Sequence, residues 1–232
     1  MRRMKSVLSS LSLMAVFAAP ASAAPCGNGG GGFNAWKVAF AAEAKAAGVG
    51  QRGLDALANS QYASSTIAAD RNQKGVRYAL NDFIRIRLGS LDGFAASARK
   101  RKVRNATFYQ SLENRYGVPA GVLLAIHGME TGFGRNMGNS AVVPAILTLA
   151  YDCRRSSLFT PHAIGALVLV DRGSITASTK GAKHGELGHT QFLPGNALRY
   201  GVDANGDGRV DLDKKAGSRG RAIKRANRTS GS

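Results

Sequence analysis

The sequence predicts a mainly α-helical fold with few short strands. Apolar residues recur at the three- and four-residue spacing of helices along most of the chain, and glycine or proline closes or opens the periodic segments. Credible alternating runs, which are typical of strands, are few. The 232 residues, less a leader peptide, are enough for one good core or for a core with a small subdomain.

The first half of the chain is expected to form helices that end at glycines. The predicted helices cover 33–47, 51–58, 62–73, 76–88 and 91–116. Gly48 closes the first of them, and Gly117 closes the last, which is long and rich in Arg and Lys. The apolar face expected for the first helix comprises Phe33, Trp36, Val38, Phe40 and Ala44.

In the second half, Pro119 is expected at the first position of a helix, where its missing N–H costs no hydrogen bond. The residues expected to form the buried stripe of that helix are Val122, Leu123, Ile126 and Met129. Two further helices are predicted over 141–151 and 156–170. Residues 173–183 are expected to form an irregular loop with a small extended piece, followed by a glycine-bearing turn over 185–194.

The N-terminus has the pattern of a secretory signal peptide. A basic start precedes the apolar stretch 7–19, and Ala21-Ser22-Ala23 fits a small-x-small cleavage site. We expect residues 1–23 to be removed and the product to be soluble and periplasmic, without a transmembrane segment. Residues 24–32 are predicted to be a flexible glycine-rich leader, 33–212 the folded domain, and 213–232 a basic, disordered tail.

The two cysteines, Cys26 and Cys153, both follow the predicted cleavage site. Because an exported protein meets an oxidising compartment, we expect a disulfide between them, with two unpaired thiols as the alternative. Lipid attachment at Cys26 is disfavoured by the preceding Pro25. Two cysteines in a chain of this size do not suggest a zinc site.

The chain is strongly basic, with 32 Lys and Arg against 14 Asp and Glu. Three of the basic residues lie in the predicted signal peptide, so the remainder still has 29 basic residues against the same 14 acidic ones. Such a charge favours polyanionic partners. For an exported protein an envelope polymer is a more economical partner than nucleic acid.

Glu130 is the strongest candidate for a catalytic residue. It follows the apolar helical stretch 119–129 and precedes Gly132 and Gly134. A carboxyl group at the wall of an apolar cleft is desolvated, holds its proton near neutral pH and can donate it to a leaving group, as a glycosidase acid must. The alternative is a helix-terminal Glu that faces solvent.

Several motifs occur together in an order that resembles a known family. The motifs are Phe33-x-x-Trp36, Asp70-Arg71-x-Gln73, Arg115-Tyr116-Gly117-Val118-Pro119, Gly128-x-Glu130-Thr131-x-Phe133-Gly134, Tyr151-Asp152-x-Arg154-Arg155, Gly188-x-Thr190-Gln191-Phe192 and Asp203-Ala204-Asn205-Gly206-Asp207-Gly208. In this order they resemble the membrane-bound lytic murein transglycosylase B family, which has a lysozyme-like core. The resemblance covers roughly 33–212.

The resemblance implies an enzyme that cuts the β-1,4 bond between N-acetylmuramic acid and N-acetylglucosamine of peptidoglycan glycan strands. The muramic 6-hydroxyl attacks its own anomeric carbon and leaves a 1,6-anhydro end, so one carboxyl group can serve as acid and then as base. By match to the family motif this group is Glu130. No cofactor is required, and a monomer is expected.

The resemblance also indicates residues of a sugar-binding site. Gln191 matches a position that lines the cleft, although a turn-stabilising glutamine is the alternative. Thr131, Phe133 and Tyr151 are further candidates, and the two aromatic residues fit a core role better. Two neighbours have simpler interpretations: Glu186 as a solvated loop residue, and His127 as a core histidine that could also tune Glu130.

A loop near the C-terminus has the first half of a calcium-binding pattern. Its candidate ligands at alternate positions are Asp203, Asn205, Asp207, Arg209 and Asp211. The pattern does not close, because Lys214 occupies the twelfth position and basic residues follow. We expect calcium to bind weakly at most, and an Asx-rich turn without metal is the alternative.

The family normally continues beyond this loop, where 221–228 retains only a faint echo of its next helix. A shortened cleft predicts weak activity or low stability. The alternatives to a lytic transglycosylase are therefore a catalytically impaired peptidoglycan-binding homologue and, less favoured, a basic binder of nucleic acid or anionic lipid with the same fold. The absence of groove-facing charge and the signal peptide argue against nucleic acid.

Overall fold

The structure is a computed structural model that describes residues 23–72, 78–203 and 207–212. The predicted signal peptide up to residue 22, the basic tail and Asn205 lie outside the described residues. The helices are α1 (Phe33–Ala46), α2 (Gln51–Ala58), α3 (Ser64–Arg71), α4 (Leu80–Leu88), α5 (Leu91–Arg104), α6 (Ala106–Tyr116), α7 (Ala120–Thr131), α8 (Val142–Tyr151), α9 (Ser156–Asp171) and α10 (Pro194–Tyr200). The strands β1 (Ser140–Ala141) and β2 (Lys180–Gly181) form an antiparallel pair.

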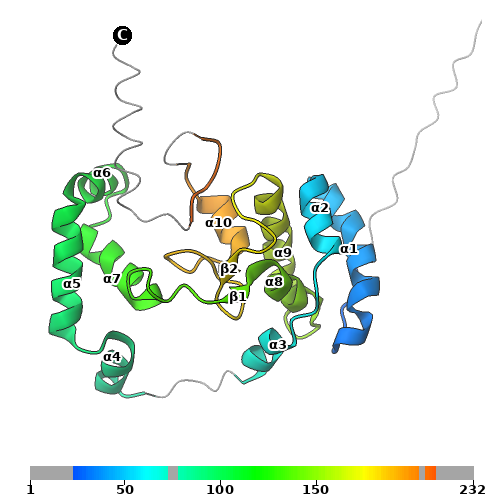
Figure 1. Cartoon of the computed structure of the whole chain (residues 1–232), viewed down its shortest axis with the longest axis horizontal. Helices are drawn as coiled ribbons and strands as arrows, with labels where there is room; N and C mark the ends of the chain where they lie inside the picture. The colour runs from blue at the N-terminus through cyan, green and yellow to red at the C-terminus, as the bar shows by residue number, and fades with distance from the viewer. Residues whose placement is uncertain (1–22, 73–77, 204–206, 213–232) are drawn as a thin grey trace, which may run out of the picture.

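The helices are arranged in two lobes (Figure 1). The large lobe contains α1–α3 and α8–α10, and the small lobe contains α4–α7. The β1–β2 pair lies between them, and the chain passes from α7 into β1 and α8. The prediction of a mainly α-helical fold with few short strands is confirmed.

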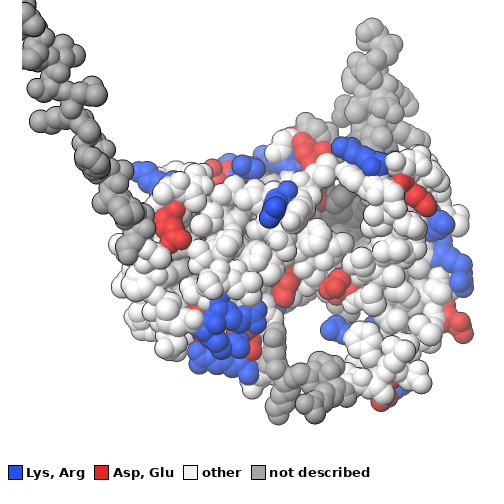
Figure 2. Space-filling model, turned by 180° about the vertical axis from the view of Figure 1, so that it is seen from behind, with Lys and Arg blue, Asp and Glu red and all other residues white. Residues whose placement is uncertain are grey.

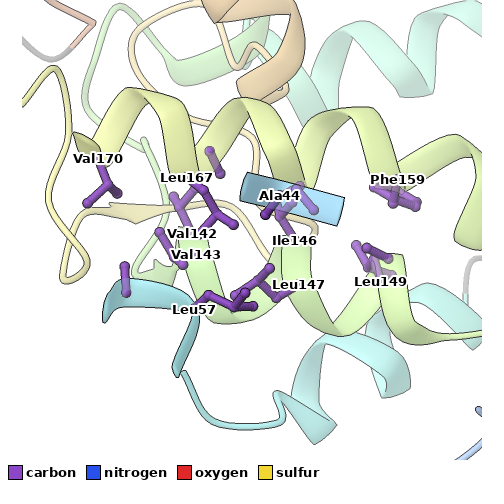
Figure 3. Close-up of a cluster of buried hydrophobic side chains, with 14 of the residues drawn as sticks. Ala44, Leu57, Val142, Val143, Ile146, Leu147, Leu149, Phe159, Leu167 and Val170 are labelled. Atoms are coloured by element: carbon purple, nitrogen blue, oxygen red, sulfur yellow. The ribbon is translucent and has the colours of Figure 1, made fainter. Parts of the chain in front are cut away.

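The large lobe is built around α8 and the second half of α9, which are apolar on nearly every side. A helix that is apolar all round must be buried, and every residue of α8 except Pro144 is buried. Figure 3 shows side chains of α8 and α9 packed together with Leu57 and Ala44. On α1, Phe33, Trp36, Phe40 and Ala44 are buried as expected. Val38 was expected on the same face but is 78% exposed, because it lies about 150° round the helix from the centre of that face.

The glycine-rich leader is held against the large lobe. A 3₁₀ turn, η1 (Gly30–Gly32), leads directly into α1. Gly27 donates its amide to the Tyr151 carbonyl at 2.9 Å, and the Tyr151 hydroxyl donates to the Gly29 carbonyl at 2.9 Å. A disulfide joins Cys26 to Cys153 beside these contacts. These contacts join residues 26–29 of the predicted leader to the end of α8 in this structure.

Two sequence motifs meet through crossed ion pairs at the lower edge of the large lobe. Asp70, at the end of α3, pairs with Arg154 and at 2.9 Å with Arg155. In return, Arg71 pairs with Asp152 at 2.8 Å. Both aspartates are buried, so these pairs supply the compensation that a buried carboxylate requires.

The small lobe departs from the predicted helices at one point. The single helix expected over 91–116 is wrong: it is divided into α5 and α6 at Asn105, whose backbone has φ −120° and ψ 35°. The Asn105 side-chain amide donates to the Arg101 carbonyl at 3.1 Å. This bond serves a carbonyl of the last turn of α5, which explains why the helix ends there.

The buried face of α7 is also different from the predicted one. Val122, Ile126 and Met129 are 49%, 42% and 40% exposed. The face that packs against the small lobe consists of Ala120, Leu124, Gly128 and Thr131. A Cβ atom at Gly128 would lie 2.3 Å from the Phe94 ring, so the glycine permits α5 to approach closely. The prediction placed the larger apolar residues of α7 in the core. In the structure the face that contains Gly128 is buried instead, because its missing side chain allows close packing against α5.

None of the helices in the described ranges is both long and apolar enough to cross a membrane.

Candidate active site

Glu130 lies in the last turn of α7, where the lobes meet. The helix ends in the left-handed conformation of Gly132, and the amides of Gly132 and Phe133 donate to the carbonyls of Gly128 and His127 at 2.9 and 3.2 Å. The Glu130 side chain is exposed, so the expected desolvation is wrong for this structure. The buried face of α7 lies on Leu124 and Gly128, which turns position 130 toward solvent.

The turn over 185–192 lies directly against this helix end. Thr131 donates its hydroxyl to the His189 carbonyl at 2.8 Å and accepts the Gly134 amide at 2.9 Å. The His189 ring occupies the space beside Gly134, where a Cβ atom would lie 2.3 Å from its Cε1. Because Gly134 also has φ +84°, only glycine fits here without strain.

A pair of histidines joins the same two segments. His127 Nε2 and His189 Nδ1 are 2.9 Å apart, and the two rings are nearly perpendicular. Burial, the His189 ring and the Arg101 guanidinium lower the pKa of His127 from 6.5 to about 4. His127 is therefore neutral at physiological pH.

Phe133 is buried beneath this pair and belongs to the small lobe's core. It packs against Phe94 with 5.2 Å between ring centroids, and the Arg101 guanidinium lies 4.1 Å from its ring centroid. Its φ of 63° is uncommon for a bulky residue. The strained backbone directs the ring back into the lobe instead of along the chain.

Gln191 also has a positive φ, 53°, in the turn beside His189. Its Nε2 donates to the Gly188 carbonyl at 2.9 Å and approaches the Met137 carbonyl at 3.4 Å. The first bond stabilises the turn, and the second reaches the loop that follows Glu130. The side chain thus lies on the turn that faces the carboxylate helix.

Three sequence candidates for sugar binding lie in the interior. Thr131 is fully buried, with its hydroxyl used by His189 and Gly134, and Phe133 is buried in the small lobe. Tyr151 lies in the core of the large lobe, apart from the cluster that contains Phe133. Direct sugar contact by these side chains does not fit their burial, because core packing and backbone hydrogen bonds already use them.

A second group of ionisable side chains extends from the crossed ion pairs toward the turn. His184 lies 3.9 Å from the carboxylates of both Asp70 and Glu186. One oxygen of Glu186 is buried without a hydrogen-bond partner in the described structure. Glu186 was expected to be a solvated loop residue, and it is only partly exposed because the turn folds back onto the end of α3.

In the described part of the predicted calcium loop, two carboxylates accept backbone amides. Asp203 accepts the Gly208 amide at 2.7 Å, and Asp207 accepts the Arg209 amide at 3.0 Å. Within the described ranges, no three His, Cys, Asp or Glu side chains group closely enough to hold a metal ion. These carboxylates are used as turn acceptors, as in the Asx-turn alternative.

An opening separates the two lobes in the space-filling view, with acidic side chains at its edge (Figure 2). The exposed apolar stripe of α7 is formed by Val122, Ile126 and Met129, and Glu130 follows directly. A concavity of the large lobe, lined by residues such as Trp36, Glu43 and Thr160, shares no residue with this region. The candidate site is therefore the junction between α7 and the turn 185–192.

The fold agrees with comparisons to known proteins. The chain belongs to the Transglycosylase SLT domain family, which matches residues 32–217. A similar protein is membrane-bound lytic murein transglycosylase B of Escherichia coli (strain K12), 34% identical over 110 residues, which are 45% of this chain and 30% of that protein. The predicted family resemblance is thereby confirmed.

Solved structures support the same fold. SltB3 from Pseudomonas aeruginosa in complex with NAG-anhNAM-pentapeptide is 30% identical, with a TM-score of 0.72 over 86% of this chain and 53% of SltB3. Escherichia coli Slt35 in complex with calcium is 22% identical, with a TM-score of 0.69 over 90% of this chain and 67% of Slt35. The chain spans about a third of the curated relative and about half of SltB3.

The sequence did not indicate the histidine pair or the crossed ion pairs. His127 and His189 are 62 residues apart, and spacing along the chain says nothing about such a contact. The only local signal was the position of His127 three residues before Glu130, on nearly the same helix face.

Proposed function

We propose that the chain is an exported lytic transglycosylase that cleaves the β-1,4 bond between N-acetylmuramic acid and N-acetylglucosamine and leaves 1,6-anhydro ends. The observation that carries this proposal is the position of Glu130. The residue ends α7 in a chain of the transglycosylase family, and its helix end is hydrogen-bonded to the turn that contains Gln191.

In the proposed reaction, Glu130 first donates a proton to the glycosidic oxygen while the bond from that oxygen to the muramic anomeric carbon breaks. The resulting carboxylate then takes the proton of the muramic 6-hydroxyl as its oxygen bonds to the same carbon. Glu130 ends protonated again, and no water is consumed. A second catalytic carboxylate is unnecessary because the nucleophile belongs to the substrate.

Because Glu130 is exposed in the folded chain, the proposed site is completed only when the substrate binds beside this carboxyl group. A glycan strand that lies along the apolar stripe of Val122, Ile126 and Met129 would exclude water from the neighbouring carboxyl group. The apolar faces of sugar rings suit such a surface. Desolvation would then arise on binding instead of being built into the folded chain.

We assign the other candidates by their surroundings. Gln191 is proposed to bind sugar hydroxyl or N-acetyl groups from the turn. Thr131, Phe133 and Tyr151 are proposed to support the fold of the site, because they are buried. The proposed substrate is the glycan strand of peptidoglycan, the proposed location is the periplasm, and the chain is proposed to act as a monomer.

No cofactor takes part in the proposed step. Weak calcium binding by 203–211 remains a prediction of the sequence, to which the calcium complex of Slt35 gives support at the level of the fold. Asp203 and Asp207 accept backbone amides within this loop, which is the arrangement of the Asx-rich turn. A melting curve with calcium and with a chelator tests it, and equal melting temperatures would exclude a stabilising site.

A catalytically impaired peptidoglycan-binding protein is the second candidate. The exposed side chain of Glu130 favours it, because a solvated carboxyl group is a poor general acid at neutral pH. Binding to intact cell-wall sacculi is expected from both candidates and does not separate them.

Digestion of purified peptidoglycan separates them. The full chain should release anhydromuropeptides, detected by mass spectrometry, whereas Glu130→Gln should release at least about 10³-fold less because it cannot exchange the proton. Glu113→Gln, on α6, is the matched control and should retain activity. Sacculus binding without products from the unmodified chain would favour the binding protein, and hydrated reducing ends would contradict the intramolecular reaction.

A further inference from the structure

The histidine pair between α7 and the turn 185–192 is not used by the proposed reaction. His127 comes from the helix that ends with Glu130, and His189 lies two residues before Gln191. Their facing nitrogens, Nε2 and Nδ1, are 2.9 Å apart. The pair therefore connects the two segments that supply the acid/base and the proposed sugar-binding amide.

Few other polar contacts join these segments. The Thr131 hydroxyl donates to the His189 carbonyl at 2.8 Å, and Gln191 reaches the Met137 carbonyl only at 3.4 Å. The imidazole contact joins a side chain of α7 to a side chain of the turn. Because loops are more mobile than helices, such a contact helps to keep the turn that carries Gln191 at a constant distance from the end of α7.

The surroundings make this contact sensitive to protons. Arg101 from α5 adds positive charge near His127, and Arg135 acts on Arg101 from the loop after α7. Glu130 follows one turn later on α7 but is exposed, and the Phe133 ring covers His127 at 5.6 Å between centroids. From the turn, the facing group is His189 itself.

The number of protons bound to the two imidazole rings determines whether the hydrogen bond between His127 and His189 can form. In the neutral pair, one facing nitrogen carries hydrogen and the other accepts it. A first added proton can occupy an outer nitrogen and leave the contact intact, at the cost of a charge that burial and Arg101 oppose. A second proton places hydrogen on both facing nitrogens, so the contact is lost.

We propose that His127 and His189 are positioning residues whose hydrogen bond holds the end of α7 against the turn of Gln191, and that protonation of the pair releases this turn. The inference rests on the proposed function of Glu130 and Gln191 and deepens it. It adds an acidic limit to the pH range of activity that does not arise from Glu130.

Two substitutions of His127 separate a positioning role from simple packing. His127→Gln retains the contact in both states, because its amide can donate to neutral His189 or turn its oxygen to accept from protonated His189. His127→Leu fills the space but removes the hydrogen bond. His162→Gln, in the large lobe, is the matched control because His162 is also partly buried and its pKa is also lowered by burial.

Amide hydrogen exchange of the full chain between pH 7 and pH 4 tests the inference without substrate. The reporters are the amides of Leu187 and Phe192, which donate to each other's carbonyls, and the amide of His189, which donates to the Leu212 carbonyl. In the unmodified chain and in His162→Gln, their protection should fall as the pH decreases toward 4, the pKa of His127. Protection should stay constant in His127→Gln and be low at every pH in His127→Leu.

Kinetics on soluble glycan strands provide the second readout. His127→Leu should lower kcat by about 10- to 100-fold with little change in KM, as expected for a displaced catalytic group, and His127→Gln should restore kcat and broaden the acidic limb. Wild-type protection and pH profile in His127→Leu would overturn the inference. Loss of activity in all chains, with the exchange pattern intact, would instead overturn the proposed function and leave the pair established.

Discussion

The two lobes bury their apolar residues to very different extents. In the large lobe, nearly all of α8 and the second half of α9 are buried, and α1, α2, α3 and α10 add further core residues. In the small lobe, the core consists of Tyr109, Ala120, Leu124 and Phe133 with a few partly buried neighbours. The large lobe thus has an extensive core, whereas the small lobe carries Glu130 on a helix that leaves much of its apolar surface exposed.

Core truncations should give the largest effect and test this difference directly. Leu167→Ala, at 0% exposure in the large lobe, should lower the free energy of unfolding by about 3–5 kcal/mol. Leu124→Ala, in the small lobe, should cost about 2 kcal/mol, because its loosely filled surroundings can collapse. Urea denaturation measures both values, and equal losses would contradict the contrast between the lobes.

Reduction of the disulfide should have the next largest effect and act on the large lobe. Cys26 and Cys153 close a loop of 127 residues, so Cys26→Ser with Cys153→Ser should lower the free energy of unfolding by about 2–5 kcal/mol. Hydrogen exchange should increase at the leader and the end of α8. Equal increases in α4–α7 would show that the lobes are more tightly coupled than their contacts indicate.

Two glycines of α7 provide a matched test within the small lobe. Gly128→Ala should destabilise it by about 1–3 kcal/mol, because the added Cβ would lie 2.3 Å from the Phe94 ring. Gly121→Ala meets nothing within 4 Å and should stabilise the helix by about 0.5–1 kcal/mol. Thermal unfolding gives both signs, and a stabilising Gly128→Ala would mean that α5 and α7 pack less closely than described.

The smallest expected effect is the dependence of stability on pH. The pKa of His127 is lowered in the folded chain to about 4, so between pH 6.5 and 4 the unfolded chain binds more protons. This contribution to stability is complete above about pH 6.5 and is lost as the pH falls toward 4. The melting temperature of His127→Gln should therefore fall less steeply over this window than that of the unmodified chain.

The sequence predicted the helices of the large lobe well, because their pattern and their burial agree. In α8 and in the second half of α9 nearly all residues are apolar and buried, so the prediction did not have to choose between faces. On α7 both faces are apolar, and the prediction chose the larger residues. The choice depended on the Phe94 ring of α5, which fits only over Gly128.

The prediction of the site was also limited because it depends on which face of α7 is buried. Glu130 and Gln191 were singled out by motifs, and the structure brings their segments together through Thr131 and His189. The expected desolvation of Glu130 required a wall that the helix face does not provide. Thr131, Phe133 and Tyr151 belong to motifs because they support the local fold, and a motif alone does not distinguish support from contact.

The sequence by itself determined the helical class, the positions of most helices, the two cysteines available for pairing and the identity of the candidate acid. These properties depend on local periodicity and on residue chemistry, which the chain carries at each position. Tertiary structure alone decided which face of α7 is open, that Asp70 crosses to Arg154 and Arg155, and that His127 meets His189. Such contacts depend on close packing between segments far apart in the chain, where a single ring or a missing Cβ atom selects one arrangement over another.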